Sequence, residues 1–229
     1  MIPLVVIRPE PGCAASVSAA RELGLKAHGF PLFAIRALAW EAPPAAEFGA
    51  LLVGSANAFR HGGPGLERYR ALPVHAVGAA TAEAGRAAGF AVAATGSGGL
   101  QRVLDAISPG TRLLRLAGAE RIELSPPAGV TMTEREVYAS EPLPAPPALV
   151  ELLAAPAVIL LHSAQAARHL VTECDRLGLA RDRLRLATIG PRVSAAAGAG
   201  WGALAAAANP SESTLLAKAR DLCQTPSGR

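Results

Sequence analysis

The chain of 229 residues has few aromatic and charged side chains and almost no lysine. Aromatic residues make up 4%, which leaves few platforms for stacking bases and argues against a protein that binds single-stranded nucleic acid. Lys26 and Lys218 are the only lysines, and no run of five or six basic residues accompanies the formal charge of +4, so a nucleic-acid-binding tail is not supported. The excess of arginine reflects either the base composition of the coding sequence or a surface that receives carboxylates through bidentate pairs.

Signals for metal binding, export and membrane insertion are also absent. The three cysteines are far apart, no C-x-x-C pair occurs, and the five histidines do not cluster with them, so we expect reduced thiols and no metal. The start, MIPLVVIRPE, has no basic segment and reaches Arg8 too early for a secretory signal. No apolar run reaches about 18–20 residues. We therefore expect a soluble, cytoplasmic protein.

What the chain does contain is a hydrophobic share of 51%, arranged as short apolar runs that alternate with helical stretches. This alternation predicts an α/β protein with parallel sheets covered on both faces, and the length suits two domains of roughly 100–150 residues each. Strands are expected near 4–7, 26–30, 51–53, 74–77, 91–94, 112–116, 130–133, 157–161, 185–189 and 203–206. Helices are expected at 13–23, after 55, at 80–88, from 99 to about 107, and at 164–177, 191–199 and 212–223. The segment 33–40 and the proline-rich stretch 142–147 are expected to be extended connections.

The chain also resembles itself. The run Leu-Leu-Val-Gly-Ser-Ala-Asn-Ala at 51–58 aligns with Ile-Leu-Leu-His-Ser-Ala-Gln-Ala at 159–166, and each copy reaches Arg-His one turn later. Downstream, His-Ala-Val-Gly at 75–78 aligns with Ala-Thr-Ile-Gly at 187–190. The repeat places the same strand-to-helix loop at the carboxyl end of a strand twice, where open α/β sheets bind ligands and helix N-termini receive anions. Ser55 and Ser163 are therefore either simple helix N-caps or parts of a binding cleft between two lobes.

Taken in order, these segments resemble the uroporphyrinogen-III synthase family over almost the whole chain. The residues that carry the resemblance are Arg8-Pro9, the run 52–58, the run Ala76-Val77-Gly78-Ala79-Ala80-Thr81-Ala82, Val137-Tyr138, Leu161-His162-Ser163 and Ile189-Gly190-Pro191. The resemblance implies two flavodoxin-like lobes joined by two extended segments. One lobe would be discontinuous, formed by residues 1–36 and 142–229, and the other would span 39–138, with crossings at about 33–40 and 137–147.

The resemblance also implies an activity. It is the dehydrating cyclisation of hydroxymethylbilane to uroporphyrinogen III, with inversion of ring D, in tetrapyrrole biosynthesis on the route to haem. Neither a metal nor another cofactor is implied. The expected protein is a monomer whose tetrapyrrole substrate is handed over by the preceding synthase, without nucleic acid or membrane partners.

Because the substrate carries eight carboxylates, loop amides, hydroxyls and arginines suit it better than an apolar pocket. Tyr138 matches a family tyrosine that faces the cleft, so it is the candidate to assist the departing hydroxyl; the alternative is an aromatic side chain packed at a hinge. The candidates for substrate binding are Arg8, Ser55, Gly78, Thr81, Gly118, Ser163 and Gly190. Arg8 has the alternative of a surface ion pair, and Thr81 that of a helix cap.

The chain departs from the family pattern after Gly190-Pro191, where a threonine is replaced by Arg192-Val193-Ser194. Arg192 and Ser194 are both candidates for its role. The main rival interpretation is a non-catalytic two-lobed protein that closes around a small molecule. A dinucleotide-binding enzyme is disfavoured, because the glycine cluster at 96–99 lacks G-x-G-x-x-G spacing.

Overall fold

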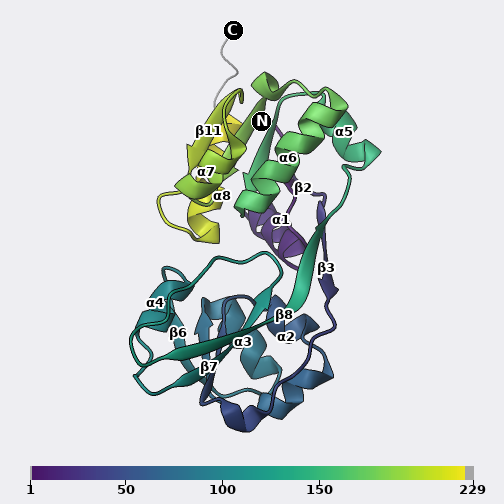
Figure 1. Cartoon of the computed structure of the whole chain (residues 1–229). Coiled ribbons are helices and arrows are strands. Elements are labelled where there is room, and N and C mark those ends of the chain that lie inside the picture. Colours follow the sequence, from purple (N-terminus) through teal and green to yellow (C-terminus); the bar gives the residue numbers. More distant parts are fainter. Residues whose placement is uncertain (1, 225–229) are drawn as a thin grey trace. The chain divides into compact units, whose positions relative to one another are not determined.

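The structure, a computed structural model, describes residues 2–224. Met1 and residues 225–229, which the expected first lobe includes, lie outside the described residues. The described chain forms two compact units: unit 1 contains residues 2–34 and 142–224, and unit 2 contains residues 35–141. The chain passes from unit 1 to unit 2 within one strand and returns within another (Figure 1).

Unit 1 is built on a five-stranded sheet in the order β11-β10-β9-β1-β2, in which every neighbouring pair is parallel. Its strands are β1 (Leu4–Val6), β2 (Ala27–Gly29), β9 (Ala157–Leu161), β10 (Leu184–Thr188) and β11 (Ala203–Ala206). The three central strands are buried along their whole length, which is why β1 and β9 are continuously apolar rather than alternating; β10 also contains the buried polar residues Arg185 and Thr188.

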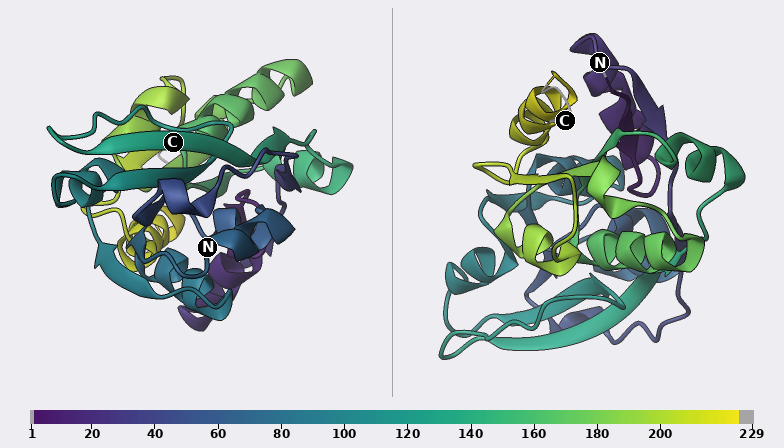
Figure 2. Two further views of the ribbon diagram at one scale, coloured as in Figure 1. Left: turned by 60° about the horizontal axis from the view of Figure 1, so that its bottom comes forward. Right: turned by 90° about the horizontal axis from the view of Figure 1, so that it is seen from above.

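Helices cover both faces of this sheet (Figure 2, right). The helical segments are α1 (Gly12–Glu22), α5 (Pro147–Leu153), α6 (Ala164–Leu177), η3 (Arg181–Arg183), α7 (Pro191–Ala197) and α8 (Glu212–Gln224). Alternate residues of β9 point to opposite faces: Ile159 packs with α5, α6 and α7, whereas Val158 and Leu160 pack with α1 and α8. The helix α6 spans the range that its sequence predicts, since Ser163 caps its start and Gly178, in a left-handed conformation, ends it.

Unit 2 is built on a six-stranded sheet in the order β3-β8-β7-β4-β5-β6. Its strands are β3 (Phe33–Ala37), β4 (Ala50–Val53), β5 (Val74–Val77), β6 (Val92–Gly96), β7 (Arg112–Gly118) and β8 (Thr131–Pro142). The pairs from β8 to β6 are parallel. The edge strand β3 runs antiparallel to β8. This direction follows from two backbone hydrogen bonds, in which the N–H of Leu38 donates to the carbonyl of Val137 and the N–H of Leu143 donates to the carbonyl of Leu32.

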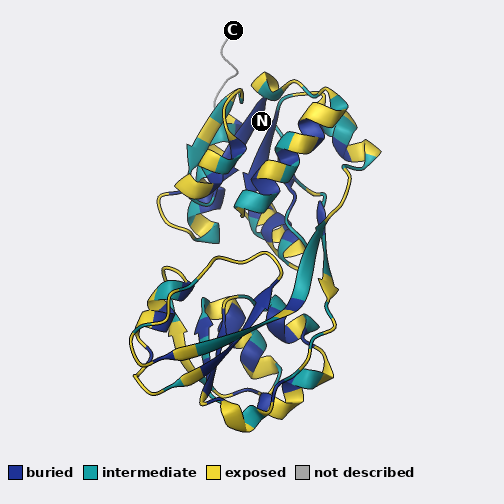
Figure 3. Cartoon of the chain, viewed as in Figure 1, coloured by how far each residue is buried: buried dark blue, intermediate teal, exposed yellow. Residues whose placement is uncertain are grey.

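The sheet of unit 2 is also covered on both faces, and its central strands are the most buried part of the unit (Figure 3). The helical segments are η1 (Ala45–Glu47), α2 (Asn57–His61), η2 (Pro64–Tyr69), α3 (Ala79–Ala87) and α4 (Leu100–Asp105). Leu51 and Val53 face α2, η2 and α3, and Leu52 faces α4. The predicted α/β class with parallel sheets is confirmed, with β3 as the antiparallel exception.

Two expectations from the sequence are wrong in extent. The strand expected at 130–133 is β8, which continues to Pro142, and part of the proline-rich stretch begins the helix α5. Pro147 is the first residue of α5, a position where its missing N–H costs nothing and its fixed φ favours the helix.

Candidate functional site

Four predicted residues lie along one edge of the sheet of unit 2. Ser55 and Gly78 follow β4 and β5, Gly118 ends β7, and Tyr138 pairs with Gly118 from the neighbouring strand β8. These strands are neighbours in the order β8-β7-β4-β5 and are parallel, so their carboxyl ends meet at the same edge. That edge is the usual ligand site of an open α/β sheet.

Tyr138 and Gly118 are in close contact. A Cβ atom added to Gly118 would lie 2.8 Å from both Cε2 and Cζ of Tyr138 and 3.0 Å from its hydroxyl. The aromatic ring therefore occupies the space above Gly118 that any other residue would fill. The ring is half-buried against the core of unit 2, and its phenolic oxygen has no hydrogen-bond partner within residues 2–224. Tyr138 is thus an aromatic side chain in close contact with Gly118, with a hydroxyl that has no partner in the described residues.

The loops after β4 and β5 differ in detail. The hydroxyl of Ser55 accepts a hydrogen bond from the backbone of Asn57 at 3.2 Å, before the short helix α2. Gly78 has a φ of +79°, which favours glycine, and apart from its chain neighbours no atom of residues 2–224 lies within 4 Å of the position that its Cβ would take. Its backbone is therefore open to a ligand. Thr81 is the third residue of α3 rather than its cap, and it is only 5% exposed.

The corresponding edge of unit 1 carries Arg8, Ser163 and Gly190, which follow the neighbouring strands β1, β9 and β10. Ser163 is the N-cap of α6, and its hydroxyl accepts a hydrogen bond from the backbone of Ala166 at 3.1 Å. The helix-capping role considered for this serine is therefore present. Gly190 has an extended backbone that any residue adopts, and in the described part of the chain nothing but its chain neighbours lies within 4 Å of its Cβ position. The backbone of Gly190 is therefore accessible to a ligand, although its conformation does not require glycine.

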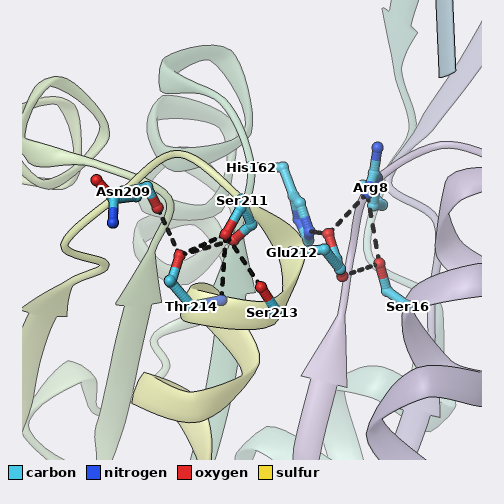
Figure 4. A network of polar contacts seen from close by, with 8 residues as sticks. All are labelled: Arg8, Ser16, His162, Asn209, Ser211, Glu212, Ser213 and Thr214. Carbon is cyan, nitrogen blue, oxygen red and sulfur yellow. Dashed lines mark hydrogen bonds and ion pairs between the residues drawn. The ribbon is translucent and has the colours of Figure 1, made fainter. Parts of the chain in front are cut away.

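Arg8 belongs to a polar network at this edge (Figure 4). Glu212, the first residue of α8, receives hydrogen bonds from Arg8 at 3.2 Å, from the buried Ser16 at 2.5 Å and from Nε2 of His162 at 3.0 Å. Burial disfavours ionisation of Glu212, but the hydrogen bonds from His162 and Ser16 and the charge of Arg8 outweigh it and lower the pKa of this carboxyl. Burial, together with the charge of Arg8, lowers the pKa of His162 despite its carboxylate partner. The network therefore holds one carboxylate, one guanidinium and a neutral imidazole at neutral pH.

With this geometry in place, the comparisons with known proteins assign the chain. The family model described as uroporphyrinogen-III synthase HemD matches residues 15–217. The chain belongs to the uroporphyrinogen-III synthase family. The resemblance found in the sequence is thereby confirmed, and with it the assignment as a cyclising lyase of tetrapyrrole biosynthesis. No finding favours the alternative of a non-catalytic binding protein.

Solved structures agree with the fold of this family member. The uroporphyrinogen-III synthetase of Helicobacter pylori is 16% identical, with a TM-score of 0.64 over 97% of this chain and 100% of that chain. A mutant uroporphyrinogen III synthase from Thermus thermophilus is also 16% identical, with a TM-score of 0.53 over 98% of this chain and 100% of that one. Among curated proteins, nothing matches the chain.

The two candidates for the missing family threonine have different surroundings in this synthase. The hydroxyl of Ser194 lies 2.6 Å from that of Thr188, a fully buried residue of β10, so it joins α7 to the sheet. Arg192 is exposed in the first turn of α7. Only the side chain of Arg192 is thus directed to the surface.

Other features of the synthase lie apart from the candidate residues. A pocket of about 500 Å³ lies over α2 and α3, but none of the eight predicted site residues lines it. The three cysteines are free and buried, and burial raises the pKa of each thiol to about 11.

Within residues 2–224, no three His, Cys, Asp or Glu side chains come together as potential metal ligands. No helix of this part of the chain is long and apolar enough to cross a membrane.

Glu212, Ser16 and His162 are not among the site residues predicted from the sequence. The one sequence signal for His162 is its place directly before Ser163 at a strand end. No local signal identified Glu212, which is 204 residues from Arg8.

Proposed function

We propose that this family member converts hydroxymethylbilane to uroporphyrinogen III with the residues at the carboxyl edges of its two sheets. The observation that carries the proposal is the unpartnered phenol of Tyr138, held against Gly118 at the strand ends of a uroporphyrinogen-III synthase family member. Main-chain amides near Gly78 and Gly190 and the hydroxyls of Ser55 and Ser163 are suited to the acetate and propionate groups of the substrate.

The reaction does not require a strong acid from the protein. The hydroxymethyl C–O bond of the substrate breaks, water leaves, and the resulting azafulvene is attacked by ring D through its substituted carbon. Tyr138 donates a hydrogen bond or a proton to the departing hydroxyl. The substituted carbon carries no hydrogen, so ring D becomes aromatic again only when its bond to the bridge towards ring C breaks. The azafulvene that this leaves on ring C is attacked by the free α-carbon of ring D, which then loses its proton and restores the balance. Most of the rate advantage then comes from holding the substrate folded for attack at the correct carbon.

The experiment is a coupled assay that forms hydroxymethylbilane in situ, oxidises the products and separates the porphyrin isomers by chromatography. We expect mainly isomer III, and a sharp fall in its rate for Tyr138→Phe. The matched control is Tyr69→Phe, because Tyr69 is the other tyrosine of the chain and its hydroxyl bonds to a backbone carbonyl in the core. Only isomer I, as without protein, would reject the function. Isomer III at the wild-type rate in Tyr138→Phe would keep the function and discard the role of Tyr138.

The serine roles have a separate test, because Ser163 is also a helix cap. Ser163→Gly removes the hydroxyl yet retains most of the stability of the cap, since glycine replaces serine at an N-cap at a cost of only a few tenths of a kcal/mol. We expect the KM of this variant to rise while its melting temperature changes little. An unchanged KM would leave Ser163 with its capping role alone.

A monomer and substrate handover from the preceding synthase are further parts of the proposal that rest on the family resemblance, and a cytoplasmic location is a third part that rests on the sequence features described above. Sedimentation of the pure protein tests the first. Trapping experiments that follow free hydroxymethylbilane in the coupled system test the second, because handover would keep the free concentration low.

A further inference from the structure

Arg8 uses only part of its hydrogen-bonding capacity. Both of its side-chain contacts, to Ser16 at 3.4 Å and to Glu212 at 3.2 Å, come from Nη1. Its Nε and Nη2 have no partner in the described part of the chain, and the side chain is 35% exposed. Figure 4 shows a guanidinium nitrogen that points away from the other members of the network. Arg8 is therefore held on one side and available on the other.

Glu212 is fixed more firmly than Arg8. Its carboxylate contacts two further donors, Ser16 in α1 and His162 directly after β9, and these side chains are almost fully buried. Its position at the start of α8 adds the attraction between a negative charge and the N-terminus of a helix. The carboxylate thus lies at a defined place, and Arg8 takes its own position from it.

Gly12 provides the second constraint on Arg8. A Cβ atom at this position would lie 2.5 Å from Nε and 2.8 Å from Cζ of Arg8. The guanidinium therefore lies directly over the first residue of α1, in space that only glycine leaves open. Two independent features, the carboxylate beside Arg8 and the missing side chain beneath it, select the same position.

We propose that Glu212 is a positioning residue for substrate binding, which holds the guanidinium of Arg8 at the carboxyl edge of the unit 1 sheet so that its unused donors bind a substrate carboxylate. The inference rests on the proposed function for the identity of the ligand. A planar guanidinium binds a carboxylate best through two parallel hydrogen bonds, which requires a fixed orientation. Glu212 does not itself touch the substrate; it acts through Arg8.

The test is a double-mutant cycle. Loss of a charge-assisted hydrogen bond to the substrate predicts a KM for hydroxymethylbilane that rises roughly ten- to a hundredfold in Arg8→Gln. We expect a similar rise in Glu212→Gln, with kcat within about threefold of wild type, and no further rise in the double variant, because both changes remove the same contact. Glu67→Gln is the matched control: Glu67 also pairs with an arginine, but this ion pair is exposed and lies in η2.

Gly12→Ala separates positioning from stability. Alanine is a better helix former than glycine, so this variant should be at least as stable as wild type in thermal unfolding, while its added Cβ displaces Arg8. We expect its KM to rise in the same direction as that of Glu212→Gln. If Glu212→Gln fails to fold, Gly12→Ala still tests whether the position of Arg8 determines the KM.

Binding of the oxidised product, uroporphyrin III, measured by quenching of its fluorescence, tests the inference even if the wild type makes only isomer I. Weaker binding in Arg8→Gln, Glu212→Gln and Gly12→Ala supports it. Three results overturn it: a lower KM or tighter binding in Glu212→Gln, which would show that Glu212 competes with the ligand; additive effects in the double variant; or wild-type KM and binding in Gly12→Ala. The proposed function is rejected if the wild-type protein makes no isomer III, and the coupled assay measures this separately from binding.

Discussion

Gly118→Ala should reduce catalysis by moving Tyr138 while leaving the fold intact. The added Cβ would lie 2.8 Å from Cε2 and Cζ of the ring, whereas an ordinary contact begins at 3.4 Å, so the ring must move by about 0.6 Å to restore an ordinary contact. Displacements of about 1 Å in an active site cost on the order of a hundredfold in rate. We therefore expect kcat for isomer III to fall by up to about a hundredfold, and by no more than in Tyr138→Phe, which removes the hydroxyl altogether.

The same change should cost little stability. Overpacking in a core costs about 1–3 kcal/mol, but the ring of Tyr138 is partly exposed and its far end can move outward. Replacement of glycine by alanine also restricts the unfolded chain, which returns about 0.4–1 kcal/mol. The net loss in the free energy of unfolding should stay below about 1 kcal/mol in urea titrations. Gly49→Ala is the control, because its Cβ would meet only ordinary contacts, the nearest at 3.8 Å.

Comparison with Tyr138→Phe identifies what the hydroxyl does. A lost hydrogen bond predicts a fall in kcat of about 2- to 10-fold, whereas a lost general acid predicts about 10²- to 10⁴-fold. The reasoning is refuted if Gly118→Ala keeps the wild-type kcat. It is also refuted if Gly118→Ala reduces kcat equally in the Tyr138→Phe background, since the effect would then not pass through the tyrosine hydroxyl.

Three further predictions concern stability. Glu134→Gln should lower the free energy of unfolding by about 2 kcal/mol in urea, because it leaves the 2%-exposed Arg115 without its carboxylate partner; a change below about 0.5 kcal/mol would contradict this. Glu173 has its pKa lowered from 4.5 to about 2, first by the hydrogen bond from Arg176, so its ionisation stabilises the fold above about pH 4.5 and this contribution is lost between pH 4.5 and 2. Glu173→Gln should therefore lower the melting temperature at pH 6 but not at pH 2, and an equal loss at both would refute the linkage. Tyr69→Phe should cost about 1 kcal/mol through a lost buried hydrogen bond, with kcat per folded molecule unchanged.

The local elements could be predicted where their signals lie within a few residues. The helix α6 has a serine cap, an apolar face with helical spacing and a terminal Gly178, and its predicted bounds are those found. Short runs such as 157–161 were identified as buried strands because both faces of a parallel sheet are covered. The strand β8 was underestimated because charged residues interrupt it; Glu134 is accommodated there by the buried Arg115 of the neighbouring strand.

The candidate site, like the fold, could be predicted from the sequence only in part. Its strand-end positions followed from the repeat and the family resemblance, since parallel strands bring their carboxyl ends to one edge. The sequence by itself thus determined the α/β class, the family and the edges that carry the candidate residues. Only the tertiary structure decided that Tyr138 lies on Gly118 and that Glu212 meets Arg8, 204 residues away in the chain. Periodicity and capping act over a few residues, whereas these contacts depend on how separate strands and helices pack.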